Sequence, residues 1–172
     1  DTVRRQRQMC IRDRSGSGMQ AMLNHQTGAD CSHYTALVIS NKSGVGGISR
    51  AQEFDIPVAV VEVPAIENRV DARHQHEAKI DKLLQQHEVE LVILSGYMRL
   101  LSEQFIKNWA GQIVNIHPSL LPDFPGAHAH REVIAAGVNK SGCTVHFVDA
   151  GMDTGEIICL LYTSDAADEL CR

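Results

Sequence analysis

The sequence has few aromatic residues and no excess of positive charge. Aromatic residues make up 5% of the 172 residues, and the formal net charge is -5. Proteins that bind nucleic acid need a basic footprint for the phosphates or aromatic side chains that stack on bases. We therefore expect neither single-stranded nor duplex nucleic acid as a partner.

Long hydrophobic runs and paired cysteines are also absent. No apolar run approaches the roughly 20 residues that span a bilayer, and the arginines near the N-terminus precede no apolar signal core. The five cysteines are odd in number and lack the paired spacing of a metal site, which suits a reducing compartment. We expect a cytosolic protein with no membrane partner.

The composition is sufficient for one compact domain, because 44% of the residues are hydrophobic. Both ends differ from the body. Residues 1–14 contain five arginines and two aspartates, a local charge of +3, and residues 161–169 form a small polar string. We predict a single domain over residues 15–160, with residues 1–14 and 161–172 as non-native or disordered tails.

Short β-rich runs alternate with longer helical patterns along the body. The predicted strands cover residues 36–40, 58–63, 91–95, 113–116 and 144–148, and the predicted helices cover residues 47–54, 71–87, 103–109 and 130–136. This alternation is typical of parallel βαβ units. The predicted fold class is α/β, with an open, doubly wound, Rossmann-like and mostly parallel sheet.

The most informative segment is residues 115–126, with the sequence NIHPSLLPDFPG. Side chains two apart on a strand point to the same side, so Asn115 and His117 converge at a strand end. Pro118 holds His117 in extended geometry. A carboxylate, Asp153, follows between two glycines, and sites of open α/β sheets lie beyond the carboxyl ends of strands. We therefore expect one shared site.

An amide, an imidazole and a carboxylate together suit acyl transfer to an amine. Asn115 can donate a hydrogen bond to the oxyanion, and such a donor contributes about 3 kcal/mol. Asp153 can keep His117 protonated and help to move the proton of the attacking amine. A metal site that combines His117 and His146 with His128 and His130 is less well supported, because no third ligand follows at fixed spacing. We expect no metal, and His146 to act in packing or support.

Several segments together resemble the phosphoribosylglycinamide formyltransferases. The resemblance covers about residues 16–158. Its segments are NIHPSLLP at 115–122, PGAHAH at 125–130, ISNK at 39–42, LSGYMRLL at 94–101, GCTVHFV at 142–148 and MDTG at 152–155.

The resemblance implies transfer of a formyl group from 10-formyltetrahydrofolate to the amine of glycinamide ribonucleotide in de novo purine biosynthesis, without metal or a covalent enzyme intermediate. It implies Asn115, His117 and Asp153 as the catalytic residues. The predicted folate-binding residues are Tyr97, Met98, Arg99, Leu100, Leu101, Asp149 and Arg73. The predicted substrate-binding residues are Gly16, Ser17, Gly18, Pro118, Gly126 and His128.

The chain departs from the family at both ends. The family's phosphate-binding turn, Gly-x-Gly-Ser-Asn, is reduced to RSGSG at residues 14–18, with Gly18 in place of asparagine. We therefore expect the first strand to be missing, together with the strand and helix that follow residue 158 in the family. Such a fragment would expose a sheet edge and apolar surface.

Other functions remain open. Methionyl-tRNA formyltransferase and formyltetrahydrofolate hydrolase resemble the chain around Asn115, His117 and Asp153, but residues 125–130 and the acidic body favour the purine enzyme. An inactive folate-binding fragment is a further alternative. A metal hydrolase is the least supported.

Overall fold

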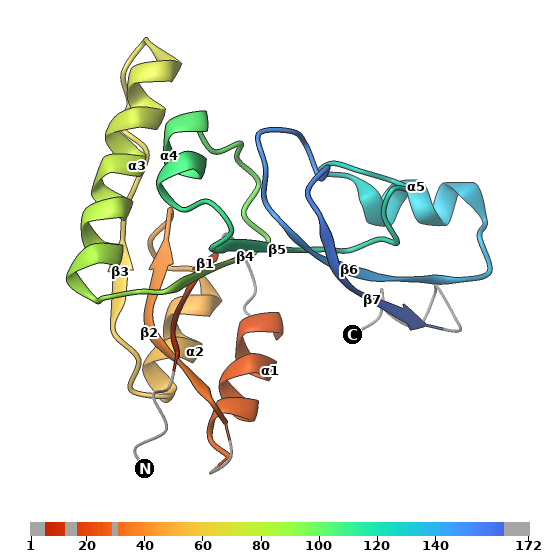
Figure 1. The fold of residues 1–172 in the computed structure, drawn as a ribbon, viewed down its shortest axis with the longest axis horizontal. Coiled ribbons are helices and arrows are strands. Elements are labelled where there is room, and N and C mark those ends of the chain that lie inside the picture. The colour runs from red at the N-terminus through yellow and green to blue at the C-terminus, as the bar shows by residue number, and fades with distance from the viewer. Residues whose placement is uncertain (1–5, 13–16, 29–30, 164–172) are drawn as a thin grey trace.

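A seven-stranded sheet organises the molecule (Figure 1). The computed structural model describes the backbone of residues 6–12 and 163 and, with their side chains, residues 17–28 and 31–162. The strands are β1 Gln6–Arg12, β2 His33–Ser40, β3 Val58–Val60, β4 Leu91–Ser95, β5 Ile113–His117, β6 Ser141–Phe147 and β7 Ile157–Thr163. Their order is β3-β2-β1-β4-β5-β6-β7. The first five strands in this order run parallel, β6 pairs antiparallel with β5, and β7 pairs antiparallel with β6.

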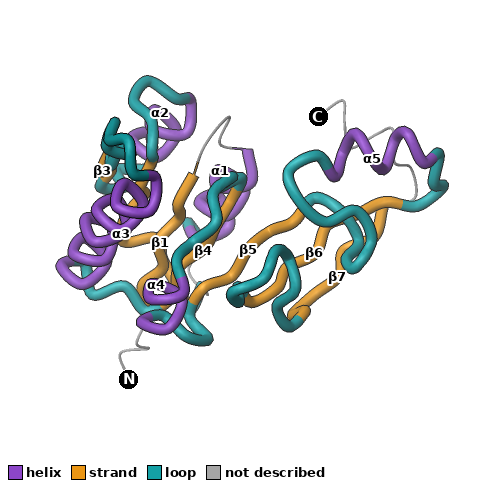
Figure 2. The backbone as a smooth tube through the Cα atoms, turned by 90° about the horizontal axis from the view of Figure 1, so that it is seen from above, coloured by secondary structure: helices purple, strands orange, loops and turns teal. Residues whose placement is uncertain are grey.

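Helices lie on both faces of the parallel part of the sheet (Figure 2). They are α1 Ser17–Gln26, α2 Gly46–Glu53, α3 Arg69–Gln86, α4 Glu103–Asn108 and α5 Ala129–Ala136. Alternate side chains of β2 face opposite sides of the sheet. Leu37 and Ile39 belong to the cluster with α3 and α4, and Val38 packs with α1 and α2 on the other side. The predicted doubly wound, mostly parallel α/β fold is confirmed. None of the helices in the described part is long and apolar enough to cross a membrane.

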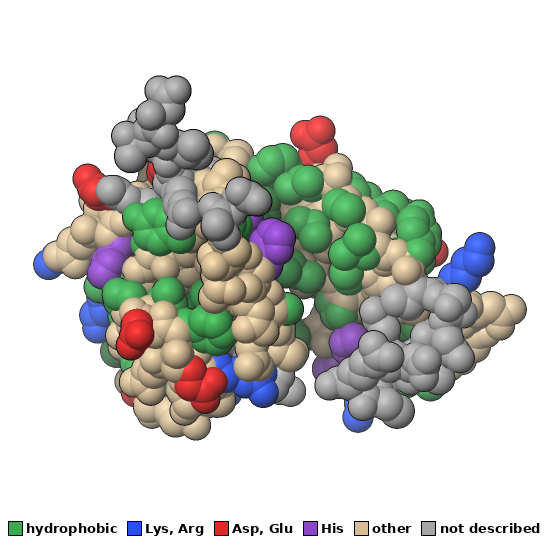
Figure 3. Space-filling model, turned by 90° about the horizontal axis from the view of Figure 1, so that it is seen from below, with side chains coloured by type: hydrophobic (Ala, Val, Ile, Leu, Met, Phe, Trp, Pro, Cys, Tyr) green, Lys and Arg blue, Asp and Glu red, His purple; other side chains and the backbone are tan. Residues whose placement is uncertain are grey.

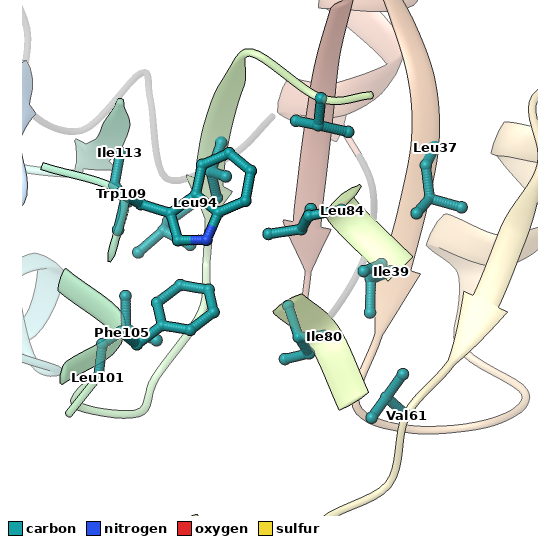
Figure 4. Packing of buried hydrophobic residues seen from close by; sticks show 12 residues of the cluster. Leu37, Ile39, Val61, Ile80, Leu84, Leu94, Leu101, Phe105, Trp109 and Ile113 are labelled. Atoms are coloured by element: carbon teal, nitrogen blue, oxygen red, sulfur yellow. The ribbon is translucent and has the colours of Figure 1, made fainter. Parts of the chain in front are cut away.

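The larger core lies between the sheet and the helices α3 and α4 (Figure 4). Ile80 and Leu84 of α3 are fully buried against β2 and β4. Trp109, at the end of α4, packs in this cluster, and its indole N–H donates to Asp81 Oδ1 at 2.8 Å. Asn68 caps the start of α3 by accepting from the backbone N–H groups of the first turn. These contacts fix α3 in position and rotation against the sheet.

The predicted absence of the first strand is wrong. Gln6–Arg12 forms β1 in the centre of the sheet, between β2 and β4. A central parallel strand normally reads as a continuous apolar run, whereas the sequence here is QRQMCIR. This polar composition concealed the strand. The proposal that residues 1–14 are non-native remains a prediction about their origin.

A strand also follows β6, which corrects the expected loss of the strand after residue 158. β7 pairs with β6 from Ser141↔Thr163 to His146↔Ile157. The helix that was expected to be missing beyond this strand falls outside the described residues. The largest shifts in predicted boundaries are in three strands: the strand predicted over 36–40 begins at His33, the strand predicted over 58–63 ends at Val60, and the strand predicted over 144–148 begins at Ser141. The helix α1 has no counterpart in the sequence prediction.

The loop between β6 and β7 is tightly packed at Gly155. A Cβ atom at this position would overlap the carbonyl oxygen of Phe147, and the Phe147 N–H donates to the carbonyl of Glu156 at 2.9 Å. We expect Gly155→Ala to lower the free energy of unfolding by about 1–3 kcal/mol, because the added methyl group forces the backbone apart. Urea unfolding measures the effect. Glu156→Ala, at an exposed neighbouring position, is the control, and equal midpoints for the two variants would contradict this account.

Candidate active site

A cleft of about 470 Å³ lies at the carboxyl ends of β4 and β5. In doubly wound sheets ligands bind where the strand order reverses, and here β1 and β4 flank that point. Gly96, with φ of +69°, turns the chain immediately after β4. The sequence-predicted residues that line the cleft are Ser17, Gly18, Tyr97, Met98, Arg99, Leu100, Leu101, Asn115, His117, Pro118, Gly126, Asp149 and Asp153.

The pairing of β5 with β6 brings an amide and an imidazole together. Asn115 lies opposite His146 in the antiparallel register, and its Nδ2 is 3.1 Å from His146 Nε2. The other ring nitrogen, Nδ1, lies 2.8 Å from the Phe147 carbonyl and therefore carries the hydrogen. His146 Nε2 is then the acceptor. This contact fixes the orientation of the Asn115 amide.

Asp153 reaches the same place from the loop between β6 and β7. Its Oδ2 lies 3.3 Å from His117 Nδ1 and accepts the N–H of Gly126 at 2.8 Å. Its Oδ1 lies 3.5 Å from both His146 Nε2 and Asn115 Nδ2. The backbone of Asp153 has φ of +55°, a left-handed conformation that aspartate tolerates better than most residues. The structure thus brings together the three residues predicted as catalytic.

The imidazole of His117 is held from both sides. It is 4% exposed, and its Nε2 lies 2.9 Å from the carbonyl oxygen of Phe124. The buried hydroxyl of Ser119 donates to the carbonyl of Asp123 at 2.7 Å and lies 3.1 Å from that of Phe124. Both ring nitrogens of His117 therefore face oxygen atoms, an arrangement that a doubly protonated ring satisfies.

A buried threonine ties this loop to the neighbouring strand. Thr144 Oγ1 donates to the carbonyl of Ser119 at 2.7 Å and accepts the N–H of Leu121 at 2.9 Å. Thr144 is paired with His117 in the register of β5 and β6. The position of His117 is therefore set by hydrogen bonds to strand and loop, as a preorganised site requires.

The arrangement offers three chemical groups to one point of the cleft. One amide hydrogen of Asn115 is accepted by His146, and the 3.5 Å contact of the amide with Asp153 is too long to occupy the other hydrogen strongly. That hydrogen is available to an oxygen in the cleft. The imidazole and carboxylate of His117 and Asp153 supply proton donors and acceptors beside it. Such a set can stabilise negative charge on a carbonyl oxygen and move one proton.

Two buried residues of α3, His76 and Glu77, contact the segment that follows β4 and lines the cleft. His76 Nε2 lies 3.3 Å from the Tyr97 hydroxyl, and the Glu77 carboxylate accepts hydrogen bonds from Ser102. Burial lowers the pKa of His76 below its usual 6.5, and the charge of Arg99 acts in the same direction. The ring is therefore neutral near pH 7. The sequence analysis missed both residues, although the spacing of His76 from Ile80 and Leu84 places it on the buried face of α3.

Three of the predicted site residues are not in the lining of the cleft. Arg73 is half-buried on α3, His128 is exposed before α5, and Gly16 lies outside the described residues. Their binding roles stay predictions. His130, which the sequence analysis considered as a metal ligand, does line the cleft. Across residues 17–28 and 31–162 no group of three or more His, Cys, Asp or Glu side chains is placed to hold a metal ion.

The sequence is similar to one protein family and to several curated proteins. The formyl transferase family matches residues 7–167. The phosphoribosylglycinamide formyltransferase of Bacillus subtilis is 41% identical, over 84% of this chain and 72% of that protein. A trifunctional purine biosynthetic protein adenosine-3 of Gallus gallus is 42% identical over 84% of this chain. The chain spans 14% of the length of that trifunctional protein.

Solved structures of the same kind match the fold. A glycinamide ribonucleotide transformylase 1 from Symbiobacterium toebii superposes with a TM-score of 0.86 at 34% identity, over 95% of this chain and 74% of that chain. A phosphoribosylglycinamide formyltransferase from Brucella melitensis gives 0.86 at 33% identity, over 97% and 86%. The similarity in sequence and the similarity in fold both extend over nearly all of the chain. The chain therefore belongs to the formyl transferase family and, within it, groups with the phosphoribosylglycinamide formyltransferases.

Proposed function

We propose that the chain transfers a formyl group from 10-formyltetrahydrofolate to the amine of glycinamide ribonucleotide. The observation that carries this proposal is the convergence of Asn115, His117 and Asp153 on one cleft at the carboxyl ends of β4 and β5. The names of the relatives in sequence and structure support the same reaction.

The reaction exchanges one carbon–nitrogen bond for another. The acceptor amine forms a bond to the formyl carbon, and the bond between that carbon and the donor nitrogen then breaks. Asn115 donates a hydrogen bond to the formyl oxygen while that oxygen carries negative charge. The amine loses one proton and the donor nitrogen gains one, and Asp153 and His117 lie where they can carry it.

The two halves of the cleft suit two different substrates. Residues 97–101 and Asp149 form one wall, where the apolar side chains of Met98 and Leu100 can cover a flat folate ring. Ser17 and Gly18 at the start of α1 form part of the other. Backbone N–H groups at a helix start bind phosphate well, which suits the ribonucleotide. The volume of about 470 Å³ is within the usual range for ligand pockets.

The choice of acceptor separates this function from its alternatives. The purified chain is incubated with 10-formyltetrahydrofolate and, in separate reactions, with glycinamide ribonucleotide, methionyl-tRNA or water alone. Mass spectrometry identifies the formylated product. We expect formylglycinamide ribonucleotide to form much faster than formylmethionyl-tRNA or free formate. Release of formate at the same rate with and without an amine would instead indicate a hydrolase.

A further inference from the structure

The cleft depends on an irregular segment, residues 96–102, which connects β4 to α4. Two of its side chains that line the cleft, Met98 and Leu100, are 53% and 57% exposed. They do not anchor the segment in the core, whereas Leu101, near its end, is 9% exposed and belongs to the larger core. The exposed part of such a binding surface keeps its shape best when polar contacts also hold the two ends of the segment.

The first end is held by a hydrogen bond between Tyr97 and His76. The two side chains approach to 3.3 Å, and His76 is 1% exposed. Because the ring is neutral near pH 7, it offers one nitrogen that accepts and one that donates, and a phenol can pair with either. The bond ties the start of the segment to the middle of α3.

The second end is held by Glu77, a carboxylate that is 4% exposed. The backbone N–H of Ser102 donates to its Oε1 at 2.8 Å, and the Ser102 hydroxyl donates to its Oε2. The same hydroxyl accepts the N–H of Phe105 at 3.2 Å and so caps α4. Hydrogen bonds to a charged oxygen are stronger than neutral ones, and a buried carboxylate requires them. They fix the point at which the segment enters α4.

Both anchors come from adjacent residues of one helix. Consecutive residues are about 100° apart around a helix, so His76 and Glu77 reach different neighbours. The helix itself cannot rotate freely, because Ile80 and Leu84 are fully buried in the core. α3 and α4 lie side by side in both views (Figures 1 and 2). The two ends of the segment are therefore held by one rigid element.

We propose that His76 and Glu77 are positioning residues that hold residues 96–102 in their binding shape and thereby set the affinity for the folate donor. The choice of folate as the ligand rests on the proposed function. Neither residue lines the cleft, so each acts through its partner on the segment. The hydrogen bonds of His76 and Glu77 described above reach Tyr97 and Ser102, and not Ser17, Gly18 or β5. Loosening the segment should therefore weaken folate binding and leave the acceptor side intact.

Two substitutions of conserved size test the proposal. In calorimetric titrations with 10-formyltetrahydrofolate we expect His76→Phe and Glu77→Gln each to raise Kd about tenfold, equivalent to about 1.4 kcal/mol. The KM for folate should rise in step, whereas kcat and the KM for glycinamide ribonucleotide should stay near wild type. His74→Phe, exposed on the same helix, and Glu103→Gln, exposed beside Ser102, are matched controls that keep the wild-type Kd.

The coupling between the anchors and the segment is measured separately. If His76 acts through Tyr97, the double variant His76→Phe with Tyr97→Phe binds folate no more weakly than the weaker single variant. Hydrogen exchange gives a readout that needs no ligand: in Glu77→Gln the amides of residues 97–102 should exchange faster while those of α3 remain protected.

The outcomes distinguish the positioning role from the proposed function. An unchanged Kd in variants that melt cooperatively, or unchanged exchange of residues 97–102, would overturn the positioning role of His76 and Glu77. A wild-type chain that binds no folate would overturn the proposed function. Exchange in Glu77→Gln would then still decide whether the segment is held from α3.

Discussion

Replacing Asp153 by asparagine is expected to reduce kcat for formyl transfer by about 10²- to 10⁴-fold, the usual contribution of a positioned proton-transfer group. The substitution keeps the size of the side chain but removes its charge. An amide nitrogen at the Oδ2 position would face both His117 Nδ1 and the N–H of Gly126, which require an acceptor there, and an amide nitrogen at the Oδ1 position would face the amide nitrogen of Asn115. The rate is measured through the absorbance change of the folate.

The fold should survive this change. Asp153 is 12% exposed and belongs to a loop, and the described cores do not include it. Glu156→Gln removes an exposed charge three residues further along the same loop and should retain full activity. If both variants melt like wild type and Asp153→Asn turns over at the rate of Glu156→Gln, Asp153 has no part in proton movement.

Replacing Asn115 by alanine is expected to lower kcat by about 10²- to 10³-fold, the cost of one missing oxyanion donor. The KM values for both substrates should change little, because the hydrogen bond forms mainly in the transition state. His146 loses the partner of its Nε2 but keeps the Phe147 carbonyl at Nδ1. Steady-state kinetics with each substrate varied in turn separates the two parameters.

A matched control is available just before the same strand. Gln112 is exposed, and its contacts with Val92 and Trp109 use only backbone atoms. Gln112→Ala should therefore retain wild-type kinetics. A rise in KM with an unchanged kcat for Asn115→Ala would mean that Asn115 binds the ground state and does not stabilise the oxyanion.

Much of the fold and the centre of the site follow from local sequence. Pro118 directly follows β5, so the strand end and the extended geometry of His117 are both predictable. The helix α3 is equally readable, because its apolar residues recur at helical spacing. Asp153 was placed by motif, and the structure brings it to His117 through the hairpin of β6 and β7.

Features that depend on contacts between residues far apart in the sequence could not be predicted from local patterns. β1 carries polar residues in a central position, and only its pairing with β2 and β4 reveals it as a strand. Glu77 lacks a local signal, since its partner Ser102 is 25 residues away. The contact between Asn115 and His146 likewise arises from antiparallel register. The periodicity of apolar residues indicates which face of a helix or strand is buried, but it does not indicate which residue of another element that face contacts.

The cleft is lined both by residues of the parallel part of the sheet and by residues of β6 and of the loop between β6 and β7. Viewed from below, histidine side chains appear close to the junction of these two parts, and hydrophobic side chains gather on one face of the part that contains β6, β7 and α5 (Figure 3). Residues of β7 contribute to the apolar exposure, with Ile158 at 50% and Tyr162 at 65%. The hairpin that delivers Asp153 is therefore also the most exposed apolar element of the described sheet. Solubility of variants in this hairpin should be checked beside their activity.

The most direct test of the account is a double-mutant cycle in formyl transfer to glycinamide ribonucleotide, with wild type, His117→Ala, Asp153→Asn and the double variant. The 3.3 Å contact between the two side chains predicts that they act as one unit in the transition state. We expect wild type to turn over and the double variant to lose no more of kcat/KM than the more damaged single variant. Losses that multiply, or a cooperatively folded wild-type chain that forms no formylated product, would contradict the account.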